Sequence, residues 1–333
     1  MIRKMTSCNI LITSAGRRVS LVELFQKAIA ELGVSGKVFA VDMQEHAPAL
    51  QVADASQVVM RATEENYIDQ LLEICKINNI DLIVPTIDTE LNILSAASDL
   101  FSQNNIKVLV CGNDTNHIFM DKRRSQSFFE SNNIPTPRLY STEESIELTA
   151  DSYPLLLKPA NGSCSIGVTK VHNKKELLFF LEYLDDAIVQ EFVQGEEYTI
   201  DVLVDFDGNV QCAVPRLRIE TRAGEVSKAI TVNNKEVVDW SYKIANLMHG
   251  AVGCVTLQCF KQANGELKFI EVNPRFGGGF PLTAAAGANY PLWILRMLNN
   301  QPTTENMQDL WQDNFAMLRF DQGLFAAADS VGL

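Results

Sequence analysis

The first 112 residues alternate short, β-rich apolar runs with helical patterns, and this alternation restricts the fold more than any other feature. The runs lie at residues 9–14, 37–43, 56–60, 81–87 and 107–112, and helices are predicted between them at 17–32, 67–78 and 90–103. Strands joined by crossover helices run parallel, so the pattern predicts an open α/β sheet that ends near Gly112. Ligands of such sheets bind beyond the carboxyl ends of the strands.

Two loops lie at that predicted edge, "TSAGRR" after the first run and "PTIDTEL" after the fourth. Gly16 before a helix and Asp42 at the end of the second run are features of dinucleotide sites. The GxGxxG motif is not there, however, so this signal is weak. In the other loop Asp88 and Glu90 either contact a substrate or belong to the start of a helix that Asp88 or Thr89 caps.

The composition argues against several classes of function. The net charge of −13 repels nucleic acid and anionic membranes, so neither is an expected partner. No apolar run approaches the ~18 residues of a membrane span, and the apolar run near the N-terminus is too short for a signal peptide. We therefore expect a cytoplasmic protein. The seven cysteines show no CxxC pair and no metal-site spacing, so reduced thiols are expected.

Beyond residue 113 the pattern changes. A helix is expected from 114 to about 131, and prolines separate it from a mixed segment with strands near 154–158 and 187–193. A strand-rich stretch from 197 to 219, a helix at 236–249 and a final pair of strands follow. The predicted fold class is α/β followed by α+β.

The final pair of strands lies in the segment "CVTLQCFKQANGELKFIEVNPR". Asn264-Gly265 between two alternating runs predicts a two-residue type I′ turn. With that turn, the numbers of facing residues sum to 529, so Gln258 lies opposite Glu271. Their Cβ atoms are then about 5 Å apart, and Asn273 lies on the same face.

The other face of this hairpin is predicted to be core, formed by Leu257, Cys259, Ile270 and Val272. The polar face gathers amide and carboxylate oxygens, which suit Mg²⁺ (or Mn²⁺) bound partly through substrate phosphates. Arg275 lies just beyond this candidate metal site and can grip an oxyanion. The alternative is an exposed sheet face with unrelated polar residues, but the glycine triplet after Arg275 favours a site.

A second candidate element is "KPANGSCSIGV". Lys158 ends an apolar strand and supplies a positive charge, while the small residues after it can offer backbone N–H groups to a polyphosphate. The loop residues with this predicted role are Gly162, Ser163, Ser165 and Gly167. The lysine precedes the glycines, so this is not a GxxxxGK[ST] loop. An ordinary surface hairpin is the alternative.

A third candidate element is "IVQEFVQGEEYTIDV". A strand that ends at Glu191, Phe192 and Val193 can present its backbone N–H and C=O groups to the edge of an adenine. Glu197 can accept hydrogen bonds from ribose hydroxyls. Taken alone, the same segment reads as a solvated acidic turn.

In this order the elements resemble the ATP-grasp superfamily, and most resemble one synthetase unit of the carbamoyl-phosphate synthetase large subunit. The resemblance covers the whole chain. It implies an α/β domain at 1–113 and an ATP-grasp domain at 114–333. Within the latter it implies a lid at about 122–193 and a larger, antiparallel-sheet, metal-binding part at about 194–333.

The resemblance also implies roles for single residues. Lys122 in "MDKRRS" matches the family's first nucleotide lysine and Lys158 the second, and the loop from 161 to 167 matches the flap over the phosphates. Further matches are the adenine hinge at Glu191, Phe192 and Val193 and the ribose carboxylate at Glu197.

The implied metal ligands are Gln258, Glu271 and Asn273, with glutamine first as in the carbamoyl-phosphate synthetase subunit. Arg275 matches the arginine that steadies an acyl-phosphate. The backbone near Gly277 and Gly278 matches a segment that approaches the substrate in single-unit ligases.

The sequence holds one such unit, which is too short for two phosphorylations joined by an internal tunnel. The resemblance therefore implies a single-unit ligase that uses ATP and Mg²⁺ to couple a small-molecule carboxylate to an amine, with ADP released. A homodimer is an expectation from the relatives. Two alternatives stay open: an enzyme that phosphorylates bicarbonate or carbamate, and an ATP-binding protein without turnover.

Four basic residues lie on or near a segment that runs close to the acceptor in relatives. They are Arg216, Arg218, Arg222 and Lys228. We interpret them as candidate binders of a substrate carboxylate. The alternative is that they are surface charges on an acidic protein.

Overall fold

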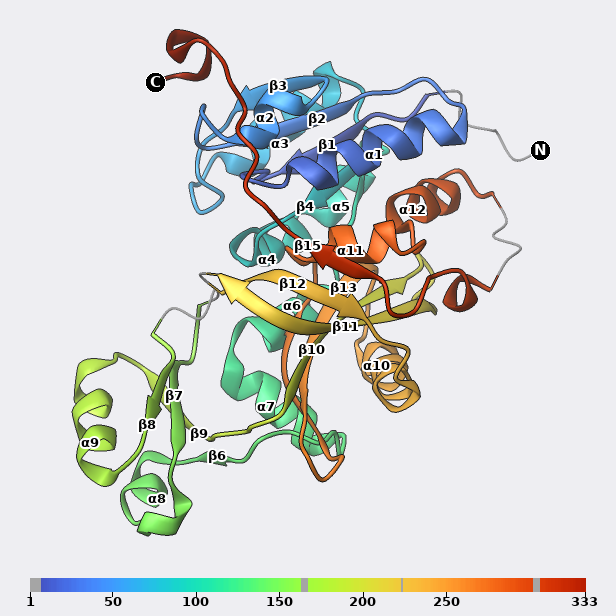
Figure 1. Cartoon of the computed structure of the whole chain (residues 1–333). Coiled ribbons are helices and arrows are strands. Elements are labelled where there is room, and N and C mark those ends of the chain that lie inside the picture. Colours follow the sequence, from blue (N-terminus) through green and yellow to red (C-terminus); the bar gives the residue numbers. More distant parts are fainter. Residues whose placement is uncertain (1–6, 163–166, 223, 302–305) are drawn as a thin grey trace.

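The computed structural model describes residues 7–162, 167–222, 224–301 and 306–333, which form three sheets (Figure 1). The first sheet is parallel and has the order β3-β2-β1-β4-β5. Its strands are β1 (Ile10–Thr13), β2 (Val38–Asp42), β3 (Ala55–Val58), β4 (Leu82–Pro85) and β5 (Lys107–Val108). Every residue of β1 and β4 is buried, as in central strands covered on both faces. The predicted open α/β sheet is confirmed.

The helices of this part are α1 (Val19–Leu32), α2 (Pro48–Val52), α3 (Tyr67–Ile77), α4 (Asp88–Ala96) and α5 (Ser98–Ser102). The single helix predicted at 90–103 is two helices, because Ala97 leaves the helical conformation with φ −92° and ψ 2°. Helix α2 is not predicted, since five residues are too few to show a helical period.

The second sheet is small, antiparallel and ordered β6-β9-β7-β8. Its strands are β6 (Leu139–Tyr140), β7 (Leu155–Pro159), β8 (Thr169–Val171) and β9 (Ala187–Glu191). It is accompanied by α8 (Thr142–Ile146), the 3₁₀ helix η1 (Ala150–Ser152) and α9 (Lys174–Tyr183). These elements enclose a small core of their own and project from the rest of the molecule at the lower left of Figure 1.

The third sheet is antiparallel and ordered β14-β13-β10-β11-β12-β15. Its strands are β10 (Glu196–Val204), β11 (Val210–Arg222), β12 (Glu225–Thr231), β13 (Gly253–Lys261), β14 (Leu267–Asn273) and β15 (Ala316–Leu318). Helices α6 (Asn113–Met120), α7 (Lys122–Ser131) and α10 (Lys235–Leu247) pack into the core on one of its faces.

Helices α6 and α7 correct two predictions. The pattern predicts one helix up to residue 131, but Asp121 ends α6 and caps α7 by accepting hydrogen bonds from the Arg123 and Arg124 N–H groups. The implied lid begins at 122, yet α7 belongs to the large sheet, because Phe129 is buried in the same core as Ile200 and Val255.

The other face of the third sheet shares one core with the N-terminal domain. Helices α11 (Phe280–Ala285) and α12 (Tyr290–Leu298) lie between them, and α12 packs against α1. Phe25 of α1 and Phe276 are in edge contact, with ring centroids 6.2 Å apart, and Trp293 and Cys212 belong to the same cluster. The two predicted domains are therefore held together by buried apolar contacts.

The last described residues form η2 (Met307–Asp309), β15 and η3 (Ala328–Val331). After β15 the chain runs along the N-terminal domain, where Gly332 lies against the Glu45 side chain (Figure 1). Among the residues that the structure describes, no helix combines the length and the hydropathy needed to cross a bilayer.

Candidate active site

The hairpin of β13 and β14 brings the predicted metal ligands together. Gln258 pairs directly with Glu271, as predicted, and Thr256 pairs with Asn273. Because side chains alternate along a strand, Asn273 lies on the same face as Glu271. The convergence of these three side chains from two adjacent strands follows from this register.

The turn behind this register differs from the prediction. The Gly265 N–H donates to the Gln262 C=O and the Gln262 N–H donates to the Glu266 C=O, both at 2.9 Å. The loop is therefore 263–265, one residue longer than the predicted type I′ turn, with Gly265 at φ 90°. A bulge between Gln258 and the next residue shifts the pairing back by one, so the register at the site agrees with the prediction.

The bulge also changes which side chains enter the core. Ile270, which is predicted to be core, is only half-buried, and Phe269 is fully buried instead. Leu257, Cys259 and Val272 lie in the core as predicted. The extra residue interrupts the two-residue alternation on which the core prediction rests.

The donor set of this face fits a magnesium ion that is bound partly through phosphates. Among the described residues, Glu271 has no hydrogen-bond or ion-pair partner, so both carboxylate oxygens can reach a cation. Asn273 is buried, and its Oδ1 accepts a hydrogen bond from Arg275 Nη2 at 3.2 Å. Across 7–162, 167–222, 224–301 and 306–333, no group of three or more His, Cys, Asp or Glu side chains could hold a metal ion. A metal ion at this face would therefore take amide and phosphate oxygens in addition to the Glu271 carboxylate.

Two lysines face Glu271 from other elements. Lys158 of β7 is 7% exposed, and Lys122, the first residue of α7, donates from Nζ to the Gly162 C=O at 2.8 Å. Burial lowers the pKa of Lys122 and lowers the pKa of Lys158 to about 8, while the charge of Glu271 opposes both shifts. The structure therefore gathers both lysines and the acid from three separate elements.

The low pKa of Lys158 predicts a pH-dependent affinity for ATP. Phosphate oxygens favour the charged ammonium, so binding takes up a proton once the pH exceeds about 8. The Kd of Mg·ATP is then expected to rise by up to about tenfold per pH unit. Isothermal titration calorimetry at a series of pH values between about 7 and 9 measures this slope.

Two variants check the origin of the slope. Lys158→Met is expected to bind ATP weakly at every pH and to lose most of the slope, because the buried titrating ammonium is gone. Lys175→Met, on the exposed surface of α9, is the matched control and should behave as the wild type. A wild-type Kd that is equal at both ends of the pH range contradicts the assignment.

The candidate adenine hinge follows β9. The Glu191 N–H donates to the Arg138 C=O at 2.8 Å, and its carboxylate accepts from the Arg138 N–H at 3.0 Å. The Glu191 side chain is therefore held by its neighbours. Among the described residues, no group hydrogen-bonds to the backbone of Phe192 or Val193, which leaves these N–H and C=O groups available to the edge of a base.

Glu197 of β10 forms an ion pair with Arg218 of β11, with Arg218 Nη1 2.5 Å from Glu197 Oε1. The same nitrogen lies 3.5 Å from Gln258 Oε1. Burial raises the pKa of Glu197, and the charge of Arg218 opposes this shift. Arg218 is predicted to bind a substrate carboxylate. In the structure it instead contacts Glu197, the predicted ribose carboxylate, and Gln258, a predicted metal ligand.

Arg216 is predicted to bind a substrate carboxylate, and this is wrong. Its side chain is fully buried, and its Nε and Nη2 donate to the Asp201 carboxylate at 2.8 and 3.1 Å. Thr283 Oγ1 also donates to that carboxylate, at 2.5 Å. A carboxylate inside the protein thus occupies two of the guanidinium nitrogens, while the buried Nη1 has no hydrogen-bond partner.

Lys228 and Arg222 are surface charges, which agrees with the alternative considered for them. Lys228 Nζ lies 2.7 Å from Glu220 Oε2, and Arg222 Nη1 lies 3.5 Å from Asp321 Oδ2. All four side chains are exposed. Such pairs contribute little to stability, and the substrate role predicted for Lys228 finds no support in this geometry.

Arg275 connects the candidate metal face with the N-terminal domain. Its Nη2 lies 2.8 Å from Asp88 Oδ2 and its Nη1 donates to the Phe276 C=O at 3.3 Å. Asp88 is the first residue of α4, whose cap residue is Ile87, so neither Asp88 nor Thr89 is the helix cap. The Asp88 carboxylate instead orients a guanidinium beside Asn273.

The acidic residues Glu90 and Asp42 stabilise the loops at the edge of the first sheet. Glu90 is fully buried and accepts from the Thr86 N–H at 2.8 Å and from Ser14 Oγ at 2.9 Å, so it has no access to a substrate. The Asp42 carboxylate accepts from the Gly16 N–H at 2.8 Å. Asp42 therefore stabilises the loop before α1. This structural role accounts for Asp42 without a bound dinucleotide.

Close packing explains the glycine triplet after Phe276. A Cβ at Gly277 would lie 3.0 Å from Thr256 Oγ1, and one at Gly278 would lie 3.1 Å from Arg18 Nη1. At Gly279 it would overlap Arg216 Nη1. The triplet lets side chains from three elements approach the backbone closely.

The predicted phosphate loop is only partly described. Gly162 and Gly167 both have left-handed backbone conformations, at φ 108° and 75°, and Gly162 contacts Lys122 as given above. Ser163 and Ser165 lie outside the described residues. Their predicted role stays a prediction.

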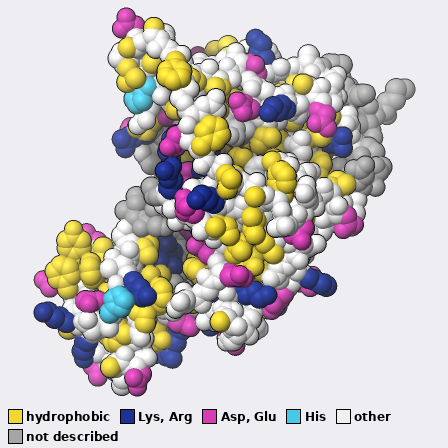
Figure 2. All heavy atoms as spheres, viewed as in Figure 1, with side chains coloured by type: hydrophobic (Ala, Val, Ile, Leu, Met, Phe, Trp, Pro, Cys, Tyr) yellow, Lys and Arg dark blue, Asp and Glu magenta, His cyan; other side chains and the backbone are white. Residues whose placement is uncertain are grey.

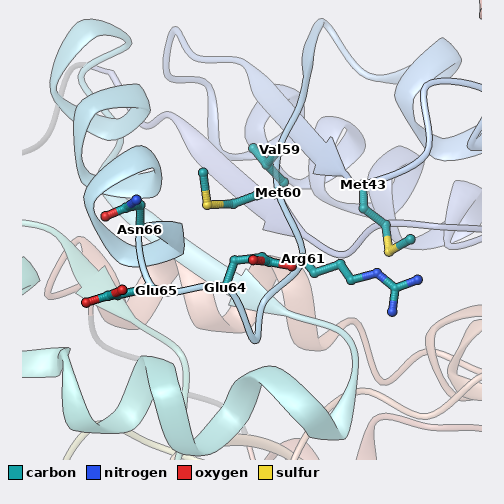
Figure 3. Close-up of a pocket in the computed structure, with 7 residues that line it drawn as sticks. All are labelled: Met43, Val59, Met60, Arg61, Glu64, Glu65 and Asn66. Atoms are coloured by element: carbon teal, nitrogen blue, oxygen red, sulfur yellow. The ribbon is translucent and has the colours of Figure 1, made fainter.

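A pocket of about 540 Å³ opens beyond β2 and β3 (Figure 3). It is lined by Met43, Val59, Met60, Arg61, Glu64, Glu65 and Asn66. In Figure 3 the Arg61 side chain extends along the pocket in the direction of Met43. None of the predicted site residues lines it, so the candidate active site is elsewhere, at the junction of the three sheets.

Three family models match successive parts of the chain. "PylC-like, N-terminal domain" matches residues 10–109, "D-ala D-ala ligase C-terminus" matches 128–223, and "ATP-grasp in the biosynthetic pathway with Ter operon" matches 183–317. The first covers the parallel sheet. The other two together cover the smaller sheet and most of the larger one.

Curated relatives are similar over parts of their length. The chain is 28% identical to the carbamoyl phosphate synthase large chain of Methanobrevibacter smithii over 242 residues, which is 66% of this chain and 23% of that one. It is 26% identical to the D-alanine–D-alanine ligase of Pseudomonas entomophila over 214 residues, 56% of this chain and 65% of that one. The chain thus spans less than two thirds of either relative.

Solved structures share the fold across nearly the whole chain. The biotin carboxylase of Campylobacter jejuni, in complex with a β-γ-ATP, superposes with a TM-score of 0.72 at 19% identity over 91% of this chain and 73% of that one. An ADP complex of N5-carboxyaminoimidazole ribonucleotide synthetase gives 0.70 at 19% identity over 95% and 81%. The ATP-grasp model matched over residues 183–317, the ligase model matched over 128–223 and the shared fold thus make this chain similar to ATP-grasp proteins.

Proposed function

We propose that this protein is an ATP-dependent ligase that activates a small-molecule carboxylate as an acyl-phosphate and couples it to an amine. The observation that carries the proposal is the convergence of Lys122, Lys158 and Glu271 beside Arg275 and Asn273. Binding of a nucleotide alone would not require an arginine oriented by an acid from another domain.

In the first step a carboxylate oxygen attacks the γ-phosphorus of ATP, the bond to the β-phosphate oxygen breaks, and ADP leaves. Catalysis of this step consists of positioning and charge stabilisation. Lys122 and Lys158 supply positive charge to the phosphates, and the Glu197–Arg218 pair faces the ribose side. When bound, Mg²⁺ on Gln258, Glu271 and Asn273 neutralises phosphate charge.

In the second step the amine nitrogen attacks the acyl carbon, phosphate leaves, and the nitrogen loses a proton. Arg275 steadies the anionic oxygens of the acyl-phosphate because Asp88 holds its guanidinium in place. A homodimer and a cytoplasmic location are part of the proposal, and light scattering coupled to gel filtration tests the dimer.

A second candidate function is phosphorylation of bicarbonate or carbamate. It is favoured by the amide Gln258 at the first metal position, which resembles the carbamoyl-phosphate synthetase subunit, and by the identity to that large chain. The two candidates differ in the acid that triggers release of ADP.

The test measures ADP release from Mg·ATP with a panel of carboxylic acids, amino acids and bicarbonate, each with and without an amine. Mass spectrometry identifies the condensed product. An acid that triggers ADP release and an amine that then yields an amide support the ligase. Release with bicarbonate and no amine supports the second candidate. Tight ATP binding with no ADP from any mixture overturns both and favours a nucleotide-binding protein without turnover.

A further inference from the structure

Four arginines gather around Gly278 where three parts of the chain meet. Arg17 and Arg18 end the loop between β1 and α1, Arg275 follows β14, and Arg319 follows β15. A Cβ built on Gly278 would lie 3.1 Å from Arg18 Nη1, and Arg319 Nη2 donates to the Gly278 C=O. Basic and acidic side chains adjoin at this junction of the N-terminal domain and the large sheet in Figure 2.

The positive charge of this arginine cluster is only partly compensated. Asp88 pairs with Arg275, and Glu225 pairs with Arg319 at 3.0 Å and with Arg17 at 3.4 Å. Four cations thus share two carboxylates, in a protein whose net charge is −13. A local excess of positive charge in a protein with a negative net charge favours the binding of an anionic ligand at that place.

Arg18 is the member without a partner. Its side chain is half-buried, and among the described residues its guanidinium forms no hydrogen bond and no ion pair. Burial lowers the pKa of Arg18 to about 10, the charge of Arg275 adds to this effect, and Glu225 opposes it. A cation in such surroundings gains stability from an anion that enters beside it.

The loop that carries Arg18 is held in one conformation. Ser14 and Gly16 both have a φ of 48°, the Gly16 N–H is bonded to Asp42, and Thr86 Oγ1 donates to the Ser14 C=O at 2.7 Å. The Arg18 N–H donates to the Ala15 C=O at 2.8 Å. The loop therefore fixes the backbone of Arg18, from which the side chain extends. A fixed backbone lowers the entropic cost of binding a ligand at the guanidinium.

The cluster lies on the substrate side of the candidate active site. Both Arg18 and Asp88 follow strands of the parallel sheet at their carboxyl ends, where ligands of such sheets bind. Arg275 contacts Asn273 on one side and is close enough to Arg18 to influence its charge on the other. A substrate that reacts beside Arg275 can therefore extend to Arg18.

We propose that Arg18, together with Gly278 and Arg319, forms a subsite for a substrate carboxylate that is not itself activated. This inference rests on the proposed ligase function. The substrate class is an acid with a second carboxylate or an amino acid that serves as the amine. Both kinds of substrate would present a free carboxylate to Arg18. The experiment below shows which of the two substrates carries that carboxylate.

The experiment compares wild type, Arg18→Gln, Arg18→Lys and Arg17→Gln. Arg17 is the matched control, because it is adjacent in sequence and its side chain is 79% exposed. The probes are pairs that differ by one carboxylate: glutarate against butyrate as the acid, and L-alanine against ethylamine as the amine. Initial rates give KM and kcat for each, and circular dichroism checks the fold.

We expect Arg18→Gln to raise KM about 10- to 100-fold for one carboxylate-bearing probe, because a hydrogen bond to a charged group is lost. The KM of ATP and of the matched probe without the carboxylate should stay unchanged, and kcat should change less than KM. Arg18→Lys should restore part of the loss, and Arg17→Gln should raise KM far less than Arg18→Gln, because the exposed Arg17 charge is screened by solvent. A raised KM for glutarate assigns the bound carboxylate to the acid substrate, and a raised KM for L-alanine assigns it to the amine substrate.

Failure of the subsite and failure of the ligase give different results. If turnover occurs and Arg18→Gln leaves KM unchanged for both pairs, the subsite is overturned while the ligase stands. If no mixture releases ADP, the subsite is tested by binding instead. Calorimetric titration with glutarate and with L-alanine then compares wild type with Arg18→Gln. Binding that depends on Arg18 supports the subsite, and equal binding or none overturns it.

Discussion

Replacing Glu271 by glutamine is expected to slow ADP release by about 10²–10³-fold and to leave the fold intact. Among the described residues the carboxylate has no hydrogen-bond or ion-pair partner, so its loss strands no protein group. What is lost is the charge that faces Lys122 and Lys158 and that holds a cation. Glutamine keeps the shape of the side chain, which confines the change to charge.

The measurement is the steady-state rate of ADP release with the acid that gives the highest wild-type rate. The matched control is Glu266→Gln, an exposed acid on the same hairpin, which should keep the wild-type rate. Thermal unfolding should give the same midpoint for all three proteins in the absence of nucleotide. A Glu271→Gln rate within about twofold of the wild type would remove this residue from the catalytic site.

Replacing Asp201 by alanine is expected to lower the free energy of unfolding by about 3–5 kcal/mol. Both partners of the Asp201–Arg216 pair are fully buried, so removal of the carboxylate leaves an uncompensated guanidinium in the core. The loss also ends the hydrogen bond from Thr283 and the one from Thr256, whose hydroxyl otherwise reaches the Arg275 C=O at 2.9 Å.

Urea unfolding of the single variants Asp201→Ala and Arg216→Met and of the double variant completes a mutant cycle. The double variant should be more stable than Asp201→Ala, because no buried charge remains without a partner. A double variant that loses as much as the two single variants combined would show that the two charges are not coupled.

The local signals in the sequence predict much of the fold and of the metal face. Strand and helix periods identify the parallel sheet, and the alternation around Asn264-Gly265 places Gln258 opposite Glu271, as the structure confirms. The turn is longer than predicted and the bulge compensates for it. A bulge escapes prediction here because it depends on packing of the hairpin against its neighbours, which a two-residue period does not contain.

The arginines show where such reasoning ends. Arg216 and Arg218 alternate on one strand and receive the same prediction, yet one is buried against Asp201 and the other reaches Glu197. Arg18 gives a weak signal through its place after the first strand, and Arg319 gives none. The side chains that surround these arginines come from other parts of the chain, so no local sequence pattern relates them.

The sequence alone thus determines most of the elements and, away from the bulge at Ile270, the face of a strand on which a side chain lies, because both follow from residue spacing. Only the tertiary structure decides what covers that face. The core shared by the two domains brings the loop after β1, the glycine triplet and the segment after β15 to one place. Burial and charge at that place set which cations are already paired and which one, Arg18, is left to meet a ligand.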